Sequence, residues 1–545
     1  MHIKTYKKLM IVVLTAFILI AATKSDDDYF EISKNLRIMS SVYEKLNGFY
    51  VDEVLPGKVM KKGINAMLKS LDPYTVYISE SEIEDFRFAT TGEYGGIGAT
   101  IKIKEDQVIV SELYKNSPAS KSKLQPGDQI IDIDGITLKG KTLEEVGNLL
   151  KGAAGSQTLL RIKRKGNTIE KKIVREDIQI PAVTFSKMIS EQTGIIKLSS
   201  FTQTSSKEFK EALMQLQEQN IKKLIIDLRS NGGGLLNEAV KIVNLFVDKG
   251  QLVVSTKSRI KEMNRSYLTQ ELPIAKEMPI VVLIDEMSAS ASEIVAGSIQ
   301  DMDRGVVVGN TSFGKGLVQQ TKQVSFGGQI KLTVAKYYTP SGRCIQKLDY
   351  STGLNSNTIA DSLVQEYKTK NGRVVTDSRG IEPDVSIDPS YYSTLTEKLL
   401  FDDYVFDYIN NIIDEVSDSI NPSTFEMSDS MYSQFSNYIL TQEIKYETAS
   451  NRLLESLKEA AVKEELLKEN MTIFVKLDSV FKTNIKRDLD KYQEEIKFFL
   501  ENEIISRKHF HSGRIEASLK YDSCVIKAQD ILNADSIYNF ILGNK

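Results

Sequence analysis

Two residue types that often carry chemistry are scarce in this sequence. Among 545 residues there are only two cysteines, Cys344 and Cys524, so a disulfide framework is excluded and at most one bridge can form. The three histidines are His2, His509 and His511, all near the ends of the chain. A serine–histidine–aspartate triad needs a histidine in the catalytic core, and so do most zinc sites. Any hydrolase in this chain must therefore use another base.

An excess of charge of one sign is also absent. The 70 Lys and Arg residues nearly balance the 73 Asp and Glu residues, which leaves a net charge of -3. This balance gives no electrostatic reason to expect nucleic acid as a partner. A hydrophobic content of 41% and a charged content of 26% are typical of soluble globular proteins, and the length predicts several domains.

The N-terminus has the pattern of an export signal. Lys4, Lys7 and Lys8 precede an uncharged apolar run from Leu9 to Ala22. A basic segment followed by such a run is typical of a secretory signal, and the run is short for a membrane span of ~20 residues. Residues 1–24 are thus expected to be a signal peptide or a signal anchor. In both cases the body of the protein is exported, to the periplasm or anchored in the membrane facing it.

Hydrophobic periodicity divides the remaining chain into four parts. Apolar positions recur at helical spacing in the first part, and short strands follow it, with turns at Glu105–Asp106 and Gly166–Asn167. The third part alternates buried strands with amphipathic helices, which predicts an α/β layer structure. The fourth part is helical and charged; it could cap the core, bind a partner, build a dimer or serve only as a solvated platform. We therefore expect an α+β multidomain protein with boundaries at 27–92, 93–178, 179–388 and 389–545.

One serine stands where a nucleophile could stand. The segment MPIVVLIDEMSASASEIVAGSIQD reads as an apolar strand, a short turn and the start of a helix. A serine at such a turn is exposed close to a helix N-terminus, as in a nucleophile elbow. The alternative is that Ser288, Ser290 and Ser292 only cap and pack the helix. A second strand-to-helix turn, DLRSNGGGLLNEA, holds three glycines whose N–H groups could stabilise an oxyanion.

A single lysine follows a third strand, in VVVGNTSFGKGLVQQ. The spacing Gly309-x-x-x-x-Gly314-Lys315 imitates a phosphate-binding P-loop. A P-loop, however, needs Ser or Thr after the lysine and then a helix, whereas Gly316 and a β-patterned segment follow here. The nucleotide-binding interpretation is therefore disfavoured. A buried lysine whose pKa is lowered can instead be the general base for a serine.

The combination and order of five motifs resemble those of the C-terminal processing peptidases, also called tail-specific proteases. The motifs are DLRSNGGGLL, SASASEIVAG, GNTSFGKGLVQQ, KYYTPSGR and RGIEPDV. The members of this family are serine peptidases with a Ser/Lys dyad, and the resemblance covers about residues 30 to 388. It implies a peptidase core with crotonase/Clp-protease-like layers and an endopeptidase that needs neither metal nor cofactor. The main alternative is a non-enzymatic PDZ adaptor with a peptidase-like scaffold.

The resemblance also implies a role for each site residue. The nucleophile is Ser290, the general base is Lys315, and Gln319 orients the lysine. The oxyanion donors are the N–H groups of Ala291 and of Gly233 or Gly234. Ser288 and Ser292 are read as structural, and Glu293 as a helix N-terminal charge.

The middle unit resembles a PDZ domain in the permuted bacterial arrangement. Gly95, Gly96, Ile97 and Gly98 would form its carboxylate-binding loop, although the same residues could be a tight glycine turn. A substrate C-terminus would bind there and add as a strand to the sheet edge, and the domain could gate the active site. The expected partners are protein substrates, with a homo-oligomer or regulatory partner through the terminal helices, no nucleic acid, and membrane contact only through the N-terminal segment.

Overall fold

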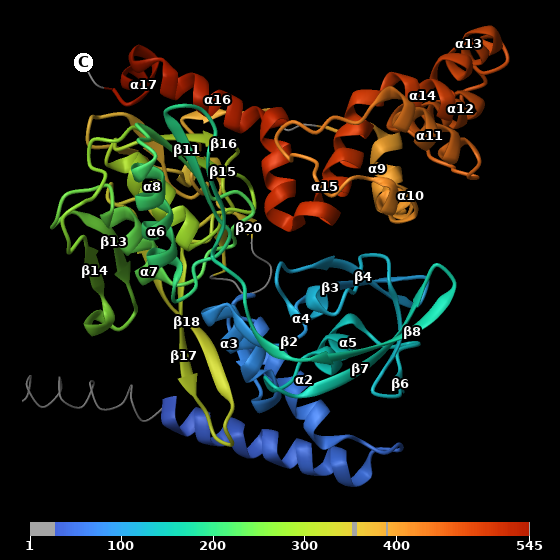
Figure 1. The fold of residues 1–545 in the computed structure, drawn as a ribbon. Coiled ribbons are helices and arrows are strands. Elements are labelled where there is room, and N and C mark those ends of the chain that lie inside the picture. Colours follow the sequence, from blue (N-terminus) through green and yellow to red (C-terminus); the bar gives the residue numbers. More distant parts are fainter. Residues whose placement is uncertain (1–27, 351–356, 389–390, 544–545) are drawn as a thin grey trace, which may run out of the picture. The chain divides into compact units, whose positions relative to one another are not determined.

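The computed structural model describes residues 28–350, 357–388 and 391–543 (Figure 1). The expected signal segment therefore lies outside the described residues. No helix within the described part of the chain has the length and apolarity needed to cross a bilayer. The chain forms two compact units, which divide between Tyr77 and Ile78.

The first unit is helical, as the periodicity predicts. A helix covers 28–49, and α2 covers Pro56–Lys69, with Pro56 at the helix start, where its missing N–H costs no hydrogen bond. On the first helix the large apolar side chains are spaced alternately by three and four residues. Those at its beginning are exposed: Tyr29, Ile32, Leu36 and Met39.

The second unit begins with the small β domain. After the short helices η1 (Glu80–Glu82) and α3 (Ile83–Thr91), its main sheet has the order β3-β4-β5-β7-β8, with β6 beside β5, while β2 pairs with β9. The strands and helices are β2 (Glu93–Gly96), β3 (Ala99–Lys104), β4 (Gln107–Leu113), α4 (Pro118–Lys121), β5 (Gln129–Ile133), β6 (Ile136–Thr137), α5 (Leu143–Leu150), β7 (Gln157–Arg164), β8 (Asn167–Val174) and β9 (Glu176–Gln179).

Both predicted hairpins of this domain form. The first turn is Glu105–Asp106, as predicted, and both residues have positive φ. The second turn is Lys165–Gly166, one residue before the predicted position, because Asn167 already pairs with Arg164. Gly166 there has a φ of 85°, which glycine adopts without strain.

The peptidase-like core is built on a six-stranded sheet with the order β10-β11-β12-β15-β16-β23. All neighbouring strands are parallel except β10 and β11. Helices α6 (Ser205–Glu218), α7 (Leu236–Asn244) and α8 (Ala291–Asp301) contribute to the main apolar core on one face. The strands are β10 (Val183–Met188), β11 (Thr193–Leu198), β12 (Lys223–Asp227), β15 (Ile280–Ile284), β16 (Val306–Gly309) and β23 (Val385–Ser386).

An antiparallel sheet adjoins this core. It includes β13 (Leu252–Lys257), β14 (Arg265–Leu268), β17 (Leu317–Gln323) and β18 (Gln329–Tyr338), with β18 between β13 and β17. Two short strand pairs follow: β19 (Leu348–Asp349) with β20 (Asn357–Thr358), and β21 (Glu366–Lys368) with β22 (Val374–Thr376). Short helical turns complete the core: η2 (Lys261–Met263) and η3 (Asp361–Leu363).

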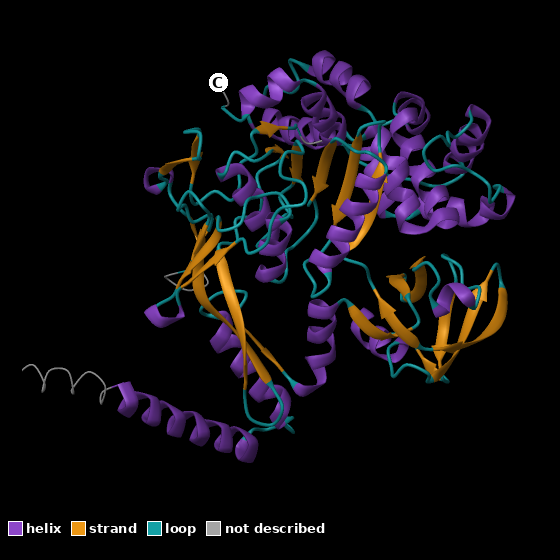
Figure 2. Ribbon diagram, turned by 60° about the vertical axis from the view of Figure 1, so that its left-hand side comes forward, coloured by secondary structure: helices purple, strands orange, loops and turns teal. Residues whose placement is uncertain are grey.

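The C-terminal helices do two different things. The first group packs around its own apolar core; it comprises α9 (Thr394–Phe401), α10 (Tyr404–Ile412), η4 (Ile413–Glu415), α11 (Asp429–Leu440), α14 (Ile485–Lys491) and α15 (Gln493–Ser518). Between α11 and α14 in the chain, α12 (Ala449–Lys463) and α13 (Met471–Phe481) form a small cluster of their own through Leu454, Ala461 and Phe474. After η5 (Leu519–Tyr521), α16 (Ser523–Asn533) and α17 (Asp535–Ile541) cover the second face of the six-stranded sheet, as Figures 1 and 2 show.

This covering completes a three-layer α/β/α arrangement. Val525, Ile531 and Leu532 pack with Ile225, Val281 and other side chains of the strands. The hydroxyl of Tyr538 also contacts the main chain of Ile280, accepting from its N–H at 3.1 Å and donating to its C=O at 3.2 Å. Of the roles considered for the extension, capping the core is confirmed, and so is the α+β multidomain fold class.

Candidate active site

Ser290 lies at a strained turn between β15 and α8. Its φ of 57° and ψ of -109° are rarely adopted by a residue with a side chain, and such strain persists only where the surroundings impose it. Ser288 and Ser292 on either side are buried and donate to main-chain carbonyls, those of Leu228 at 2.9 Å and Asn231 at 2.8 Å. These two hydroxyls thus have the structural role expected of them, and Ser290 differs from both in being partly exposed.

Glu293 joins the serine turn to the lysine loop. One carboxylate oxygen, Oε2, accepts the N–H of Ser290 at 2.7 Å and the N–H of Lys315 at 3.0 Å. The other oxygen accepts the hydroxyl of Ser312 at 2.6 Å and the N–H of Gly314 at 2.7 Å. The residue is fully buried, and burial raises the pKa of its carboxyl above the ordinary value. The sequence analysis assigned Glu293 as a charge at the helix N-terminus, which is consistent with its bond to Ser290. It missed the bonds of Glu293 to the lysine loop.

Lys315 lies in the loop that connects β16 to β17. Strand β17 begins at Leu317, where a P-loop would begin a helix. The loop approaches its neighbours closely: a β-carbon on Gly314, whose φ is +86°, would lie 2.5 Å from the β-carbon of Lys347. The next N–H, that of Gly316, is donated to the side chain of Gln346 at 2.8 Å. Main-chain contacts thus fix the position of the lysine from both sides.

Gln319 lies four residues further along the chain, within β17, at a bulge in the pairing of β17 with β18. Its side-chain amide donates to the hydroxyl of Thr333 at 3.2 Å. It also lines a groove of about 1060 Å³, whose apolar lining includes Leu235, Leu236 and Val318. The groove therefore passes beside both the glycine turn and the strand that follows Lys315.

Gly233 brings the glycine turn against the nucleophile turn. A β-carbon at this position would lie 2.5 Å from the carbonyl oxygen of Ala289, 2.8 Å from the β-carbon of Ser290 and 2.9 Å from the nitrogen of Ala291. Its φ of +94° also favours glycine. For Gly234, at φ +145°, a β-carbon would lie 2.3 Å from the carbonyl oxygen of Phe201. The two turns therefore meet at Gly233 and Ala291, which begins α8, while Gly234 packs against Phe201.

Asn231 ties these turns together, and the sequence analysis missed it. Its side chain donates to Leu198 at 2.7 Å and accepts the N–H of Gly233 at 2.9 Å. Its main-chain carbonyl accepts the N–H of Ala289 at 3.0 Å. It is completely buried, and a fully buried amide side chain must be hydrogen-bonded. A polar residue directly before a glycine run at a strand end was the available signal.

The expected carboxylate-binding loop of the small β domain is only partly a loop. Gly95 and Gly96 belong to β2 and pair with Asp177 and Glu176 of β9. Ile97 is buried in the domain core, and Gly98 has a φ of +71° immediately before β3. Strand β3 is at one edge of the sheet order, which is where a peptide would add as a further strand.

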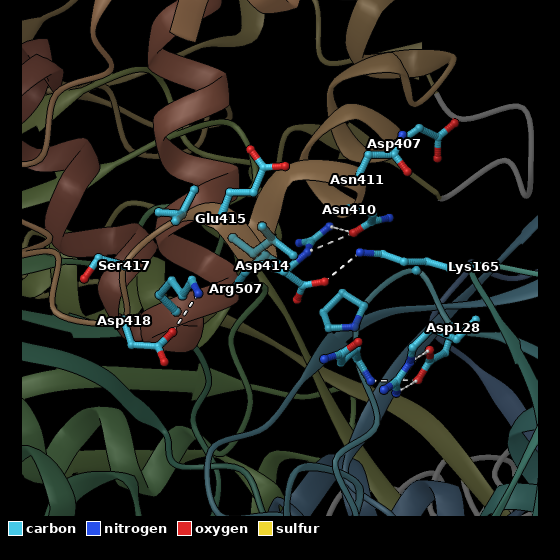
Figure 3. Close-up of a pocket in the computed structure, with 17 residues that line it drawn as sticks. Asp128, Lys165, Asp407, Asn410, Asn411, Asp414, Glu415, Ser417, Asp418 and Arg507 are labelled. Carbon is cyan, nitrogen blue, oxygen red and sulfur yellow. Dashed lines mark hydrogen bonds and ion pairs between the residues drawn. The ribbon is translucent and has the colours of Figure 1, made fainter. Parts of the chain in front are cut away.

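A second pocket, of about 980 Å³, lies between the small β domain and the C-terminal helices (Figure 3). None of the predicted site residues lines it. Its charged groups are paired: Lys165 of the β domain contacts Asp414 of the C-terminal helices at 2.6 Å, Lys508 contacts Asp418 within the helices at 2.6 Å, and Arg164 contacts Asp128 within the β domain at 2.6 Å. The Lys165–Asp414 pair joins the two parts of the unit, and the pocket lies at their interface.

Known families match three stretches of the chain. The profile described as Peptidase family S41 matches residues 192–352, the one described as PDZ domain matches residues 109–164, and the one described as "Probable PDZ-protease, C-terminal helical domain" matches residues 395–532. The S41 match includes the turns that hold Ser290, Lys315 and the glycine triplet.

Two relatives from Staphylococcus agree with these matches. A "Probable CtpA-like serine protease" of Staphylococcus epidermidis is 33% identical over 386 residues, which are 71% of this chain and 72% of that protein. A protein of the same description from Staphylococcus aureus is 33% identical over 362 residues and is matched over 66% of its own length. Among solved structures, the photosystem II D1 C-terminal processing protease is 27% identical, with a TM-score of 0.36, over 65% of this chain and 87% of that one.

Proposed function

Because this chain belongs to peptidase family S41 and has a PDZ domain, we propose that it is a serine endopeptidase that cleaves protein substrates near their C-termini with a Ser/Lys dyad. The main observation behind this proposal is that one carboxylate oxygen of Glu293 accepts hydrogen bonds from the main-chain N–H groups of both Ser290 and Lys315. The two nitrogens cannot be further apart than the sum of those two short distances. Residues from separate loops are thus held side by side at a strained, partly exposed serine.

The proposed reaction is acyl transfer. The neutral amine of Lys315 takes the proton of the Ser290 hydroxyl as its oxygen attacks the scissile carbonyl, and Gln319 orients the amine. The negative charge on the carbonyl oxygen is stabilised by the N–H groups of Ala291 and of Gly233 or Gly234. The protonated lysine then gives its proton to the leaving amine. Water, deprotonated by the same lysine, cleaves the acyl-enzyme and regenerates the serine.

The groove beside Gln319 has room for an extended substrate peptide. It has a volume of about 1060 Å³ and combines apolar side chains with polar ones along α6, α7, β14 and β17. We assign it to the peptide chain on one side of the scissile bond. The PDZ domain would bind the substrate C-terminus, with Gly95, Gly96, Ile97 and Gly98 at the carboxylate and the edge strand β3 beside the peptide, and would deliver the chain to Ser290.

We further propose that the chain is exported by its N-terminal segment and acts in the periplasm, or on the membrane facing it. The basic residues and the apolar run from Leu9 to Ala22 support this location. Fractionation of cells that produce the full chain, with and without residues 1–24, tests it. Recovery of the full chain in the cytoplasm would contradict export.

We also propose that the helix over 28–49 pairs with a second copy of itself. Its apolar residues, among them Ile32, Leu36 and Met39, follow the three-and-four spacing of a coiled-coil seam and are exposed. Light scattering on the full chain should show a dimer that Leu36→Glu converts to a monomer. An unchanged mass for this variant would exclude the seam as the contact.

The test of the catalytic proposal uses the full chain and a disordered peptide with an apolar C-terminus. Ser290→Ala and Lys315→Ala should each lower kcat at least about a thousandfold, because either change removes a member of the reacting pair. Lys322→Ala is the matched control, because Lys322 is an exposed residue of β17; this variant should cleave the peptide at the wild-type rate. Amidation of the peptide C-terminus should raise KM. Cleavage by Ser290→Ala or Lys315→Ala at the wild-type rate would overturn the dyad.

A further inference from the structure

An ion-pair network connects the C-terminal extension to the end of β12. The guanidinium of Arg229 forms two bonds to Asp522, at 2.9 and 2.7 Å, and two to Asp227, both at 2.9 Å. Asp227 ends β12, and Asp522 precedes α16 in the C-terminal extension. Two carboxylates on opposite sides thus hold one planar group in a fixed orientation, and bidentate pairs of this type are geometrically specific.

This network is well shielded from water. The side chains of Arg229 and Asp522 are 19% and 17% exposed, and that of Asp227 is 3% exposed. Lys197 adds a further bond to Asp227 at 3.1 Å and reaches the carbonyl of Arg229 at 3.4 Å. Low exposure reduces screening and makes the geometry of such a network stiff.

Arg229 lies directly before the segment that faces the nucleophile. The next N–H, that of Ser230, is donated to both oxygens of Asp285 at 2.9 Å, and Ser230 has a φ of 60°. Asn231 and Gly233 then make the contacts to Ala289 and Ser290 described above. The orientation of Arg229 therefore sets where the chain leaves β12 and enters the glycine turn.

We propose that Asp522 is a positioning residue for the oxyanion segment 230–234, acting through Arg229, so that the C-terminal helical extension is part of the catalytic apparatus. This inference rests on the proposed peptidase function. Asp522 contacts Arg229 and the first turn of α16, so its effect on the oxyanion segment passes through Arg229. Its effect is to stop the glycine turn from moving relative to the nucleophile, since a small displacement of a donor strongly reduces stabilisation of the transition state.

The test must separate this link from the second role of Asp522, which is to cap α16. Its Oδ1 accepts the N–H groups of Cys524 and Val525 at 3.0 and 3.1 Å. Serine is also a good N-cap but is too short to reach the guanidinium, so Asp522→Ser removes the link and keeps the cap. Glu516→Gln is the matched control, because Glu516 forms an ion pair with Lys187 of β10 that also joins the extension to the core.

In the full chain, Asp522→Ser should lower kcat for a peptide about tenfold, leave KM within twofold of the wild-type value, and slow phosphonylation of the active-site serine by a fluorophosphonate about tenfold. Glu516→Gln should leave all three unchanged. Equal kcat for Asp522→Ser and wild type would overturn the inference while the dyad proposal stands. Loss of kcat that merely follows a loss of folded protein, seen in the melting temperature, would also overturn it.

A second readout does not depend on activity. Amide hydrogen exchange of the segment 229–235 should become at least about tenfold faster in Asp522→Ser, and in Asp522→Asn if the serine variant does not fold. Exchange in this segment should be unchanged in Glu516→Gln. If the wild-type protein cleaves no peptide, the catalytic proposal fails, and this exchange experiment still decides whether Asp522 holds the segment. Unchanged exchange in both Asp522 variants would overturn the inference.

Discussion

Ser290 and Lys315 donate their main-chain N–H groups to the same carboxylate oxygen of Glu293, at 2.7 and 3.0 Å. The buried carboxylate thus aligns two loops whose side chains lie 25 positions apart in the sequence. Because main-chain groups make these contacts, substitution of the serine or lysine side chain leaves the alignment in place. Inactive variants at either position should consequently keep the wild-type fold.

Glu293→Gln should disrupt the site although the size of the side chain hardly changes. Each oxygen of Glu293 accepts from two donors, so an amide nitrogen in either position would face donors only. We expect a loss of about 1–3 kcal/mol of stability, since buried groups would be left unsatisfied, and a fall in kcat. Chemical denaturation and steady-state kinetics measure the two effects. Full stability and activity in this variant would show that the carboxylate does not align the loops.

Gly233→Ala should inactivate the protein, and Gly232→Ala should not. The added methyl group at Gly233 would overlap Ala289 and Ser290 and would require a φ of +94° from alanine. A methyl group at Gly232 meets nothing within 4 Å. Kinetics of both variants with one peptide form the comparison. Similar activities would mean that the turn shifts to accommodate the methyl group.

Asp227 should make the fold sensitive to acid. Burial by itself would raise the pKa of Asp227, but Arg229 and Lys197 outweigh burial and hold the pKa well below its ordinary value. The folded state therefore favours the ionised form, and this contribution is complete above the unfolded pKa of about 4 and is lost as the pH falls through lower values.

Asp227→Asn should accordingly lower the free energy of unfolding by about 3 kcal/mol near neutral pH, which is the typical cost of breaking a buried ion pair. The difference in unfolding free energy between wild type and variant should stay constant from about pH 8 to pH 5 and should shrink below about pH 4. Urea denaturation across this range measures it. A difference that instead grows on acidification would contradict the depressed pKa.

The contact between the PDZ domain and the C-terminal helices should depend on charge. Lys102 contacts Asp403 at 2.5 Å and lies over the ring of Phe406, and Lys104 contacts Asp407 at 2.7 Å. The double variant Lys102→Glu/Lys104→Glu should weaken this contact by about 1 kcal/mol per pair. Hydrogen exchange in α10 (Tyr404–Ile412) should then increase, and more so at low salt.

Lys139→Glu is the control for this prediction, since Lys139 is exposed on the same domain. It should leave exchange in α10 unchanged. Equal exchange in the double variant and the control would show that apolar packing, such as that of Phe510 against the PDZ core, suffices for the contact.

Local patterns in the sequence predicted most of the fold. The apolar runs of β12, β15 and β16 and the amphipathic helices α6 and α7 were identified, because buried strands and helices differ in periodicity. The sequence analysis placed the turn of the second hairpin at Gly166–Asn167, one residue after its position at Lys165–Gly166. A glycine can occupy either position of a short hairpin turn, so its presence alone does not fix the register. The catalytic roles of Ser290, Lys315 and Gln319 came from the family resemblance and stay predictions, although the first two now lie at adjoining loops.

The contacts that the sequence did not reveal are long-range ones made by buried or half-buried polar and charged side chains. Nothing near Asp522 in the sequence indicates that it meets Arg229, because the pairing depends on how the extension packs on the sheet. The role of Glu293 toward Lys315 was missed for the same reason: a helix-capping pattern describes the contacts within one element only. Spatial neighbours of this type become visible only when the layers are assembled.

The covering of the core sheet by α16 and α17 has a consequence for biosynthesis. A ribosome completes the strands of the core long before it makes Val525, Ile531 and Leu532, which shield the second face of the sheet. Until those late residues emerge, the nascent polypeptide presents an uncovered apolar surface and is a client for chaperones. Under our proposal it also lacks Asp522, so the oxyanion segment of the newborn chain is not held in place until translation is nearly over.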